Sequence, residues 1–208
     1  MGNRTRKLLT VGVIAAMTLS MAACTSGNDT SSSSGSSDKK ETKAGTGKIG
    51  VAMPTKDLQR WNQDGENMKK QLEDAGYEVD LQFASNDVAT QVSQVENMVS
   101  GGCDAIVIGS IDGESLGTPL KQAEEQGIPV ISYDRLIMNS SAVTYYATFD
   151  NYLVGQKQGE YIVDALDLDN TDGPYNLEIF TGDPGDNNVN FFYGGAMEVL
   201  QPYIDSGK

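Results

Sequence analysis

The chain has 208 residues and is strongly acidic, with 15 Lys and Arg against 29 Asp and Glu and a formal net charge of -14 at pH 7. A surface that binds nucleic acid needs a basic stripe, so this charge balance argues against that class of partner. The absence of histidine excludes a Ser-His-Asp triad and every metal site that needs an imidazole ligand. A neutral ligand such as a sugar is compatible with this composition.

Residues 1–23 have the layout of a secretory signal peptide. A positively charged start is followed by an apolar stretch from Leu8 that carries no charge, and small residues then precede Cys24. The last four positions, Met-Ala-Ala-Cys, resemble a lipobox, which implies that the chain is cut before Cys24 and that this thiol is lipidated. The alternative is an uncleaved membrane anchor, but the apolar run is short for a bilayer span.

Residues 24–47 are rich in Ser, Gly, Thr and Lys and show no hydrophobic period. Such a segment cannot build a core, so we expect a flexible linker behind the lipidated cysteine. A lipid and a linker together would hold a folded domain at the extracytoplasmic face of a membrane. Cys103, the other cysteine, would then lack a disulfide partner and is expected to be a small buried residue before a strand.

From residue 48 onward, short apolar runs alternate with apolar residues at helical spacing. The apolar runs predict strands over residues 49–53, 79–83, 105–108, 129–133 and 144–149. The helical spacing predicts helices over residues 61–72, 92–99, 116–123 and 151–166. This alternation predicts an α/β fold with a parallel, doubly wound sheet that is covered by helices on both faces.

After a polar turn at residues 171–174 the pattern begins again. Residues 175–181 read as one more strand, and apolar residues between positions 192 and 203 begin a new helical face. One strand and one helix cannot bury a core by themselves. We therefore expect a second α/β unit that is only begun, in a sequence truncated at Lys208.

Short segments in a fixed order along the chain carry a resemblance to a known family. They are Arg60-Trp61, Gln94–Met98, Tyr133–Ile137, Phe149–Asn151, Asp186–Asn188 and Leu200–Lys208. Together they resemble the type I periplasmic sugar-binding proteins of ABC importers, in the xylose-binding and multiple-monosaccharide-binding (ChvE) subgroup. The resemblance implies two α/β lobes that close on a monosaccharide about a hinge, and no enzymatic activity.

The same resemblance divides the folded part of the chain. It implies an N-terminal sugar-binding lobe over residues 48–151, a hinge-crossing helix and turn over residues 152–173, and the start of a C-terminal lobe over residues 174–208. It also implies a monomer that needs no cofactor or metal and that delivers sugar to ABC permease and ATPase subunits. Xylose, glucose, galactose and arabinose all remain candidates for the ligand.

The candidate site follows from the position of polar residues after predicted strands, because ligands of parallel sheets lie beyond the carboxyl ends of the strands. The resemblance implies that sugar is bound by Arg60, Trp61, Asp134, Arg135, Asp186 and Asn188. Neighbouring hydroxyls of a sugar match the fork of a carboxylate, a guanidinium or an amide. Trp61 would either stack on the sugar or pack in the core stripe of its helix. For Asp150 and Asn151 we expect a hinge or capping role.

Other functions fit parts of the pattern. Asp134 and Asp186 could flank a glycosidic bond in an exported hydrolase. The sugar-sensing domain of a repressor shares the two-lobe fold, but it would need a helix-turn-helix and no export signal. A receptor that reports sugar to chemotaxis or to a sensor kinase remains open, as does a truncated fragment without function.

Overall fold

The computed structural model describes residues 45–208. The predicted signal peptide, Cys24 and all but the last residues of the predicted linker lie outside the described residues. Among the residues that are described, no helix is both long enough and apolar enough to cross a bilayer.

A parallel sheet forms the centre of the first part of the fold, as predicted. Its strands are β1 (Lys48–Met53), β2 (Glu78–Phe83), β3 (Ala105–Ile108), β4 (Val130–Tyr133) and β5 (Val143–Ala147). They lie in the order β2-β1-β3-β4-β5, and each neighbouring pair is parallel. The direction of winding reverses beside β1, which creates the topological switch point where sheets of this kind bind ligands.

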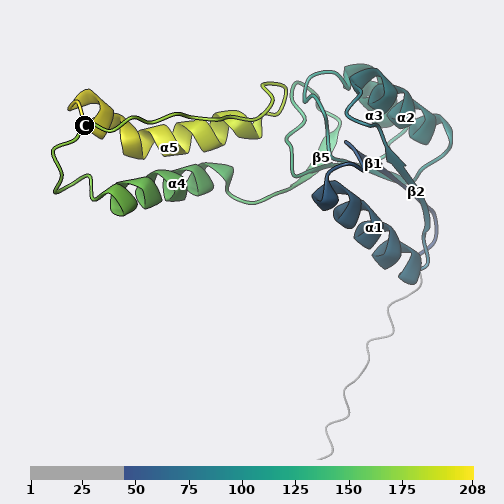
Figure 1. Ribbon diagram of the computed structural model, residues 1–208. Helices are drawn as coiled ribbons and strands as arrows, with labels where there is room; N and C mark the ends of the chain where they lie inside the picture. Colours follow the sequence, from purple (N-terminus) through teal and green to yellow (C-terminus); the bar gives the residue numbers. More distant parts are fainter. Residues whose placement is uncertain (1–44) are drawn as a thin grey trace, which may run out of the picture. The chain divides into compact units, whose positions relative to one another are not determined.

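Helices cover both faces of this sheet. They are α1 (Gln59–Asp74), α2 (Val88–Ser100) and α3 (Gly117–Glu125). Helix α1 lies on one face, and α2 and α3 lie on the other (Figure 1). The sheet is therefore doubly wound, which confirms the predicted fold class. Cys103 lies in the α2–α3 core with 2% of its surface exposed, and burial raises the pKa of its thiol.

Local sequence explains why β1 is a buried strand, where α2 begins and where α1 ends. β1 lies between two other strands and is buried from Ile49 to Met53, which suits its uninterrupted apolar sequence. Asp87 begins α2 by accepting a hydrogen bond from the Thr90 N–H at 2.7 Å. After α1, Gly76 has a φ of 97°, a left-handed conformation that glycine adopts without a steric penalty.

The second part of the described chain contains two helices that pack side by side, α4 (Asn151–Leu166) and α5 (Asn188–Asp205) (Figure 1). Their backbones approach closely at Gly155 and Gly195, where neither residue has a side chain to keep them apart. Val163, Leu168 and Leu200 form a small apolar cluster between the helices and the turn that follows α4.

The prediction of a strand over residues 175–181 is wrong, because this segment has no regular secondary structure. A strand is stable only when neighbouring strands pair with its backbone. The five strands of the sheet pair with one another instead, and within the described residues the segment's one backbone hydrogen bond runs from Tyr175 N–H to the Lys208 carbonyl at 2.6 Å. Its apolar side chains remain exposed, and Phe180 is 90% exposed. The local sequence has the strand pattern but lacks the partners.

Candidate binding site

All of the predicted site residues line one cavity of about 370 Å³. They come from the beginning of α1, the end of β4 and the beginning of α5: Arg60, Trp61, Asp134, Arg135, Asp186 and Asn188. The cavity lies at the carboxyl edge of the sheet, where the topology predicts a ligand site. Its volume falls at the small end of the range for pockets that bind small molecules, about 300–1,000 Å³.

Asp134 lies at the centre of the site and is held by its own backbone. Its φ of 63° is left-handed, a conformation that Asp tolerates better than most residues. The Asp134 carbonyl accepts hydrogen bonds from the Tyr146 hydroxyl at 3.1 Å, the Thr148 hydroxyl at 3.0 Å and the Asn188 amide at 3.2 Å. Only 6% of the side chain is exposed. The carboxylate is therefore fixed in position before any ligand arrives.

Arg60 and Asp134 form an ion pair across the site. One guanidinium nitrogen of Arg60 donates to the Asp134 carboxylate, and its Nε lies 3.4 Å from an oxygen of Asp64. Burial lowers the pKa of Arg60, but the hydrogen bond and charge of Asp134, together with the charge of Asp64, outweigh it, so the pKa is raised. Arg60 is therefore a permanent cation at the mouth of the cavity.

Arg135 forms a second ion pair and keeps unused hydrogen-bonding capacity. Its Nε lies 2.9 Å from an Asp186 carboxylate oxygen, yet within residues 45–208 the N–H is not aimed at a partner, so the contact is electrostatic and not a directed hydrogen bond. Its Nη1 donates to the Ser110 carbonyl at 3.1 Å. A buried N–H without a partner is costly, which makes this guanidinium a suitable donor to a ligand.

Trp61 packs in the core beneath both arginines. Its side chain belongs to the apolar cluster between α1 and the sheet, and only 3% of it is exposed. The guanidinium of Arg60 lies 4.6 Å from the ring centroid and that of Arg135 lies 5.2 Å from it. Such cation–π contacts hold a cation over an aromatic face. Of the two roles expected for Trp61, the structure shows core packing, and its ring also lines the cavity.

The beginning of α5 is connected to the sheet edge through Asn188. Its amide nitrogen lies 3.3 Å from a carboxylate oxygen of Asp134, and its amide oxygen accepts from the Asn151 side chain at 3.0 Å. Asp186 accepts from the Asn188 backbone N–H at 3.0 Å. The helix cap of α4 is Asp150, whereas Asn151 is buried with 5% of its surface exposed. Asn151 therefore links the two segments instead of capping.

Sequence reasoning did not identify the apolar part of the cavity wall. Leu58, Phe149 and Phe192 line the cavity together with Gln59. Phe192 follows Asn188 by one helical turn, so helical spacing from a predicted site residue could have indicated it. The cavity thus combines charged groups, which can bond to hydroxyls, with apolar walls, which can pack against C–H groups, and a pyranose has both kinds of surface.

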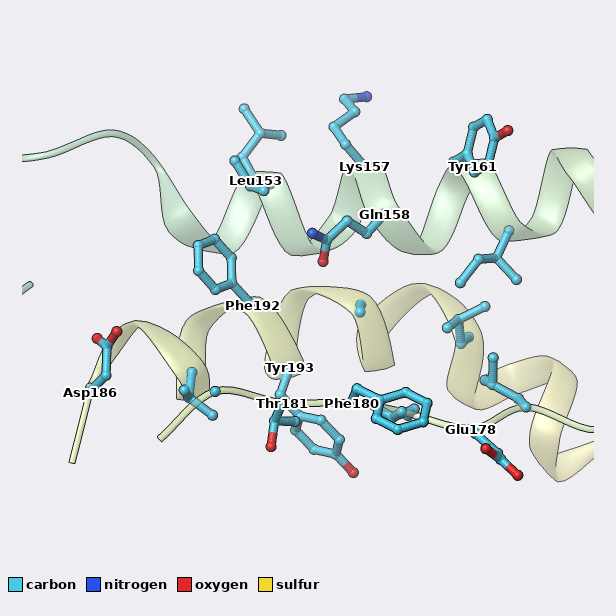
Figure 2. Close-up of a pocket in the computed structure, with 18 residues that line it drawn as sticks. Leu153, Lys157, Gln158, Tyr161, Glu178, Phe180, Thr181, Asp186, Phe192 and Tyr193 are labelled. Atoms are coloured by element: carbon cyan, nitrogen blue, oxygen red, sulfur yellow. The ribbon is translucent and has the colours of Figure 1, made fainter. Parts of the chain in front are cut away.

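A second and larger hollow, of about 880 Å³, lies along α4, α5 and residues 177–182. Figure 2 shows the two helices side by side with Phe192 between them. Most of the lining side chains are apolar, among them Leu153, Tyr161 and Phe180. A ligand rich in hydroxyls would place most of its polar groups against these apolar walls, which is unfavourable. The smaller cavity, with its carboxylates, guanidinium groups and amide, is therefore the better candidate site.

The fold and the cavity define a class of protein: an α/β domain with a polar cavity at the carboxyl edge of a parallel sheet. The chain belongs to the periplasmic binding protein family, because the family described as "Periplasmic binding protein domain" matches residues 49–207. This range contains the motifs on which the resemblance was based. The predicted membership of the family is therefore confirmed.

Individual relatives make the comparison more specific. The chain is 56% identical over 160 residues to the multiple sugar-binding periplasmic protein SbpA of Azospirillum brasilense, a match that covers 77% of this chain and 45% of the relative. It is 56% identical over 165 residues to the multiple sugar-binding periplasmic receptor ChvE of Rhizobium radiobacter, with 79% and 47% covered. The chain thus spans about half the length of these curated relatives.

A solved structure gives the same result. An ABC transporter solute-binding protein from Clostridium phytofermentans, crystallised with bound β-D-glucose, is 74% identical and has a TM-score of 0.76. The match covers 77% of this chain and 49% of that one. These relatives are described as binding proteins and not as enzymes, in agreement with the expectation that this chain catalyses no reaction.

Proposed function

We propose that the chain is an extracytoplasmic substrate-binding lipoprotein of an ABC sugar importer and that its cavity binds a monosaccharide. The observation that carries this proposal is the convergence of Arg60, Asp134, Arg135, Asp186 and Asn188 on one cavity of about 370 Å³. Because a close structural relative holds β-D-glucose, we take glucose as the first ligand to test, before xylose, galactose and arabinose.

The proposed recognition uses charged groups against neutral hydroxyls. Asp134 accepts hydrogen bonds from two neighbouring sugar hydroxyls, and Arg135 donates to a hydroxyl or to the ring oxygen. A hydrogen bond to a charged group contributes about 1.5–3 kcal/mol. A sugar that lacks a matching hydroxyl leaves a buried charge without a partner, which provides specificity.

The proposed arrangement has residues 48–151 as one sugar-binding lobe, residues 152–173 as the crossing, and residues 174–208 in a second lobe. Asp186 and Asn188 come from the second of these lobes, and their contacts with Arg135 and Asp134 support a site that is shared between lobes. A ligand bonded from both sides favours the closed arrangement and so shifts the population toward it. The closed, monomeric form would then be presented to the permease and ATPase subunits.

Export and anchoring rest on the N-terminal sequence. The proposed signal peptide is cleaved before Cys24, which is lipidated, and the linker keeps the binding domain at the outer face of the membrane. Replacing Cys24 by Ser should release the protein from the membrane fraction into the soluble fraction of cells that express it. Acyl labelling of the Ser variant equal to that of the wild type would contradict the anchor.

The sugar site is tested by calorimetric titration of the chain with glucose. Arg135→Ala should weaken binding about 10- to 150-fold, which corresponds to the loss of one hydrogen bond to a charged group. Lys121→Ala, at a position where 77% of the side chain is exposed, serves as the control and should bind as the wild type does. Equal affinities of the wild type and Arg135→Ala would overturn the site assignment. If none of the four sugars binds to the wild type, the alternative of a non-functional fragment is supported.

A further inference from the structure

Asp64 is a carboxylate beside the candidate site that does not line the cavity. It lies one turn after Arg60 on α1, and 26% of its side chain is exposed. One of its carboxylate oxygens, Oδ2, lies 3.4 Å from Arg60 Nε and also accepts a hydrogen bond from the Tyr133 hydroxyl at 3.1 Å. Asp64 therefore connects the arginine to a tyrosine of the sheet.

These contacts close a ring. Tyr133 donates to Asp64, Asp64 pairs with Arg60, Arg60 pairs with Asp134, and Asp134 is the next residue after Tyr133. The ring joins the beginning of α1 to the end of β4, which are 74 positions apart along the chain at Arg60 and Asp134. The ring of Tyr133 packs against the apolar cluster beneath α1. This packing holds the tyrosine, and with it the hydroxyl that donates to Asp64, in a fixed position.

Arg60 needs such support because 51% of its side chain is exposed. A long side chain that is held in one rotamer loses conformational entropy. A single exposed ion pair is too weak to offset much of that loss. With carboxylates at both Nε and Nη2, the plane of the guanidinium is fixed and not only its distance from Asp134.

We propose that Asp64, anchored by Tyr133, is a positioning residue that holds the guanidinium of Arg60 in the orientation that pairs with Asp134 and faces the cavity. Its effect on sugar affinity rests on the proposed function, whereas its effect on Arg60 does not. The competing explanation is an ordinary ion pair between helix positions i and i+4, of the kind that Lys70 and Asp74 form on the same helix.

The test is a double-mutant cycle with two readouts. Trp61 is the only tryptophan of the chain and lies under Arg60, so its fluorescence reports the position of the guanidinium without any sugar. Asp64→Asn should change the emission of Trp61 in the wild-type background and leave it unchanged in the Arg60→Ala background. The same substitution should weaken glucose binding about fivefold, and by less than about twofold when Arg60 is absent.

Further variants separate positioning from general stability. Asp74→Asn removes a comparable ion pair on α1 and should change neither readout. Tyr133→Phe removes the hydroxyl without changing a charge and should act in the same direction as Asp64→Asn, with a smaller effect.

The proposal is overturned if Asp64→Asn behaves like Asp74→Asn, or if its effects persist undiminished in the Arg60→Ala background. If the wild type binds no glucose, the proposed function fails, and the fluorescence cycle still decides the role of Asp64.

Discussion

The contact between α4 and α5 makes a quantitative prediction for Gly155→Ala. A Cβ at Gly155 would lie 2.2 Å from the Phe192 carbonyl oxygen and 2.9 Å from its carbonyl carbon. Both atoms belong to the backbone, so no side-chain rotation can relieve the clash. Close contacts between carbon and carbonyl oxygen are normally about 3.3 Å or longer, so the helices must separate by about 1 Å.

The expected cost follows from this displacement. Overpacking costs about 1–3 kcal/mol, and here it falls at or above the upper end because backbone must move. The better helix propensity of Ala offsets about 1 kcal/mol. We expect a net loss of about 2 kcal/mol, which lowers the melting temperature of a domain of this size by about 4–8 °C. The contact between Asn151 and Asn188 spans the same helix pair and should weaken too.

Thermal unfolding followed by circular dichroism measures this effect. Gly117→Ala is the matched control, because a Cβ at Gly117 meets no atom within 4 Å and the residue is also helical. Its stability should stay within about 1 kcal/mol of the wild type. A melting temperature of Gly155→Ala at or above that of Gly117→Ala would refute the argument that α4 and α5 touch backbone to backbone at this point.

Two further predictions concern the sheet lobe. Ile106→Ala should lower the free energy of unfolding in urea by about 2–5 kcal/mol, because the fully buried side chain leaves a cavity in the α2–α3 core. The control is Ile179→Ala, at a position that is 48% exposed, which should change the free energy of unfolding by less than about 0.5 kcal/mol. Equal urea midpoints for the two variants would contradict the placement of Ile106 in the core. The hydrogen bond from Thr90 lowers the pKa of Asp87 in the folded protein below its ordinary 3.8. The cap formed by Asp87 therefore stabilises the fold fully above pH 3.8, and this stabilisation is lost as the pH falls through the lower pKa of the folded state. The wild type should therefore lose more stability than Asp87→Asn between about pH 5 and about pH 3, and parallel pH profiles would contradict the role of Asp87 as a cap.

Periodicity in the sequence was sufficient to predict the parallel sheet and the helices α1, α2 and α3. Buried strands such as Ile49–Met53 are uninterrupted apolar runs, and α1 shows its core face through the spacing of Trp61 and Gly65. These patterns are local and follow from the geometry of strand and helix. The position of polar residues after the strands also predicted the edge at which a ligand would lie, because parallel strands all end at one edge of the sheet.

Contacts between distant segments could not be predicted in this way. The segment at 175–181 has the alternation of a strand, yet among the described residues no strand pairs with it, and a strand is stable only when it has such a partner. The support that Asp64 gives to Arg60 depends on Tyr133, which lies 69 positions from Asp64 along the chain. The two guanidinium groups over the ring of Trp61 come from Arg60 on α1 and from Arg135 after β4, so this arrangement also depends on contacts between distant segments.

Local periodicity and short motifs in the chain were enough to predict the fold class, the ligand edge of the sheet and the membership of the family. The packed structure was needed to show that the six candidate residues line one cavity, which of them pair, and how close α4 and α5 come. The physical reason is that hydrogen bonds, ion pairs and steric contacts depend on distances through space, and these are fixed only when the elements pack against one another.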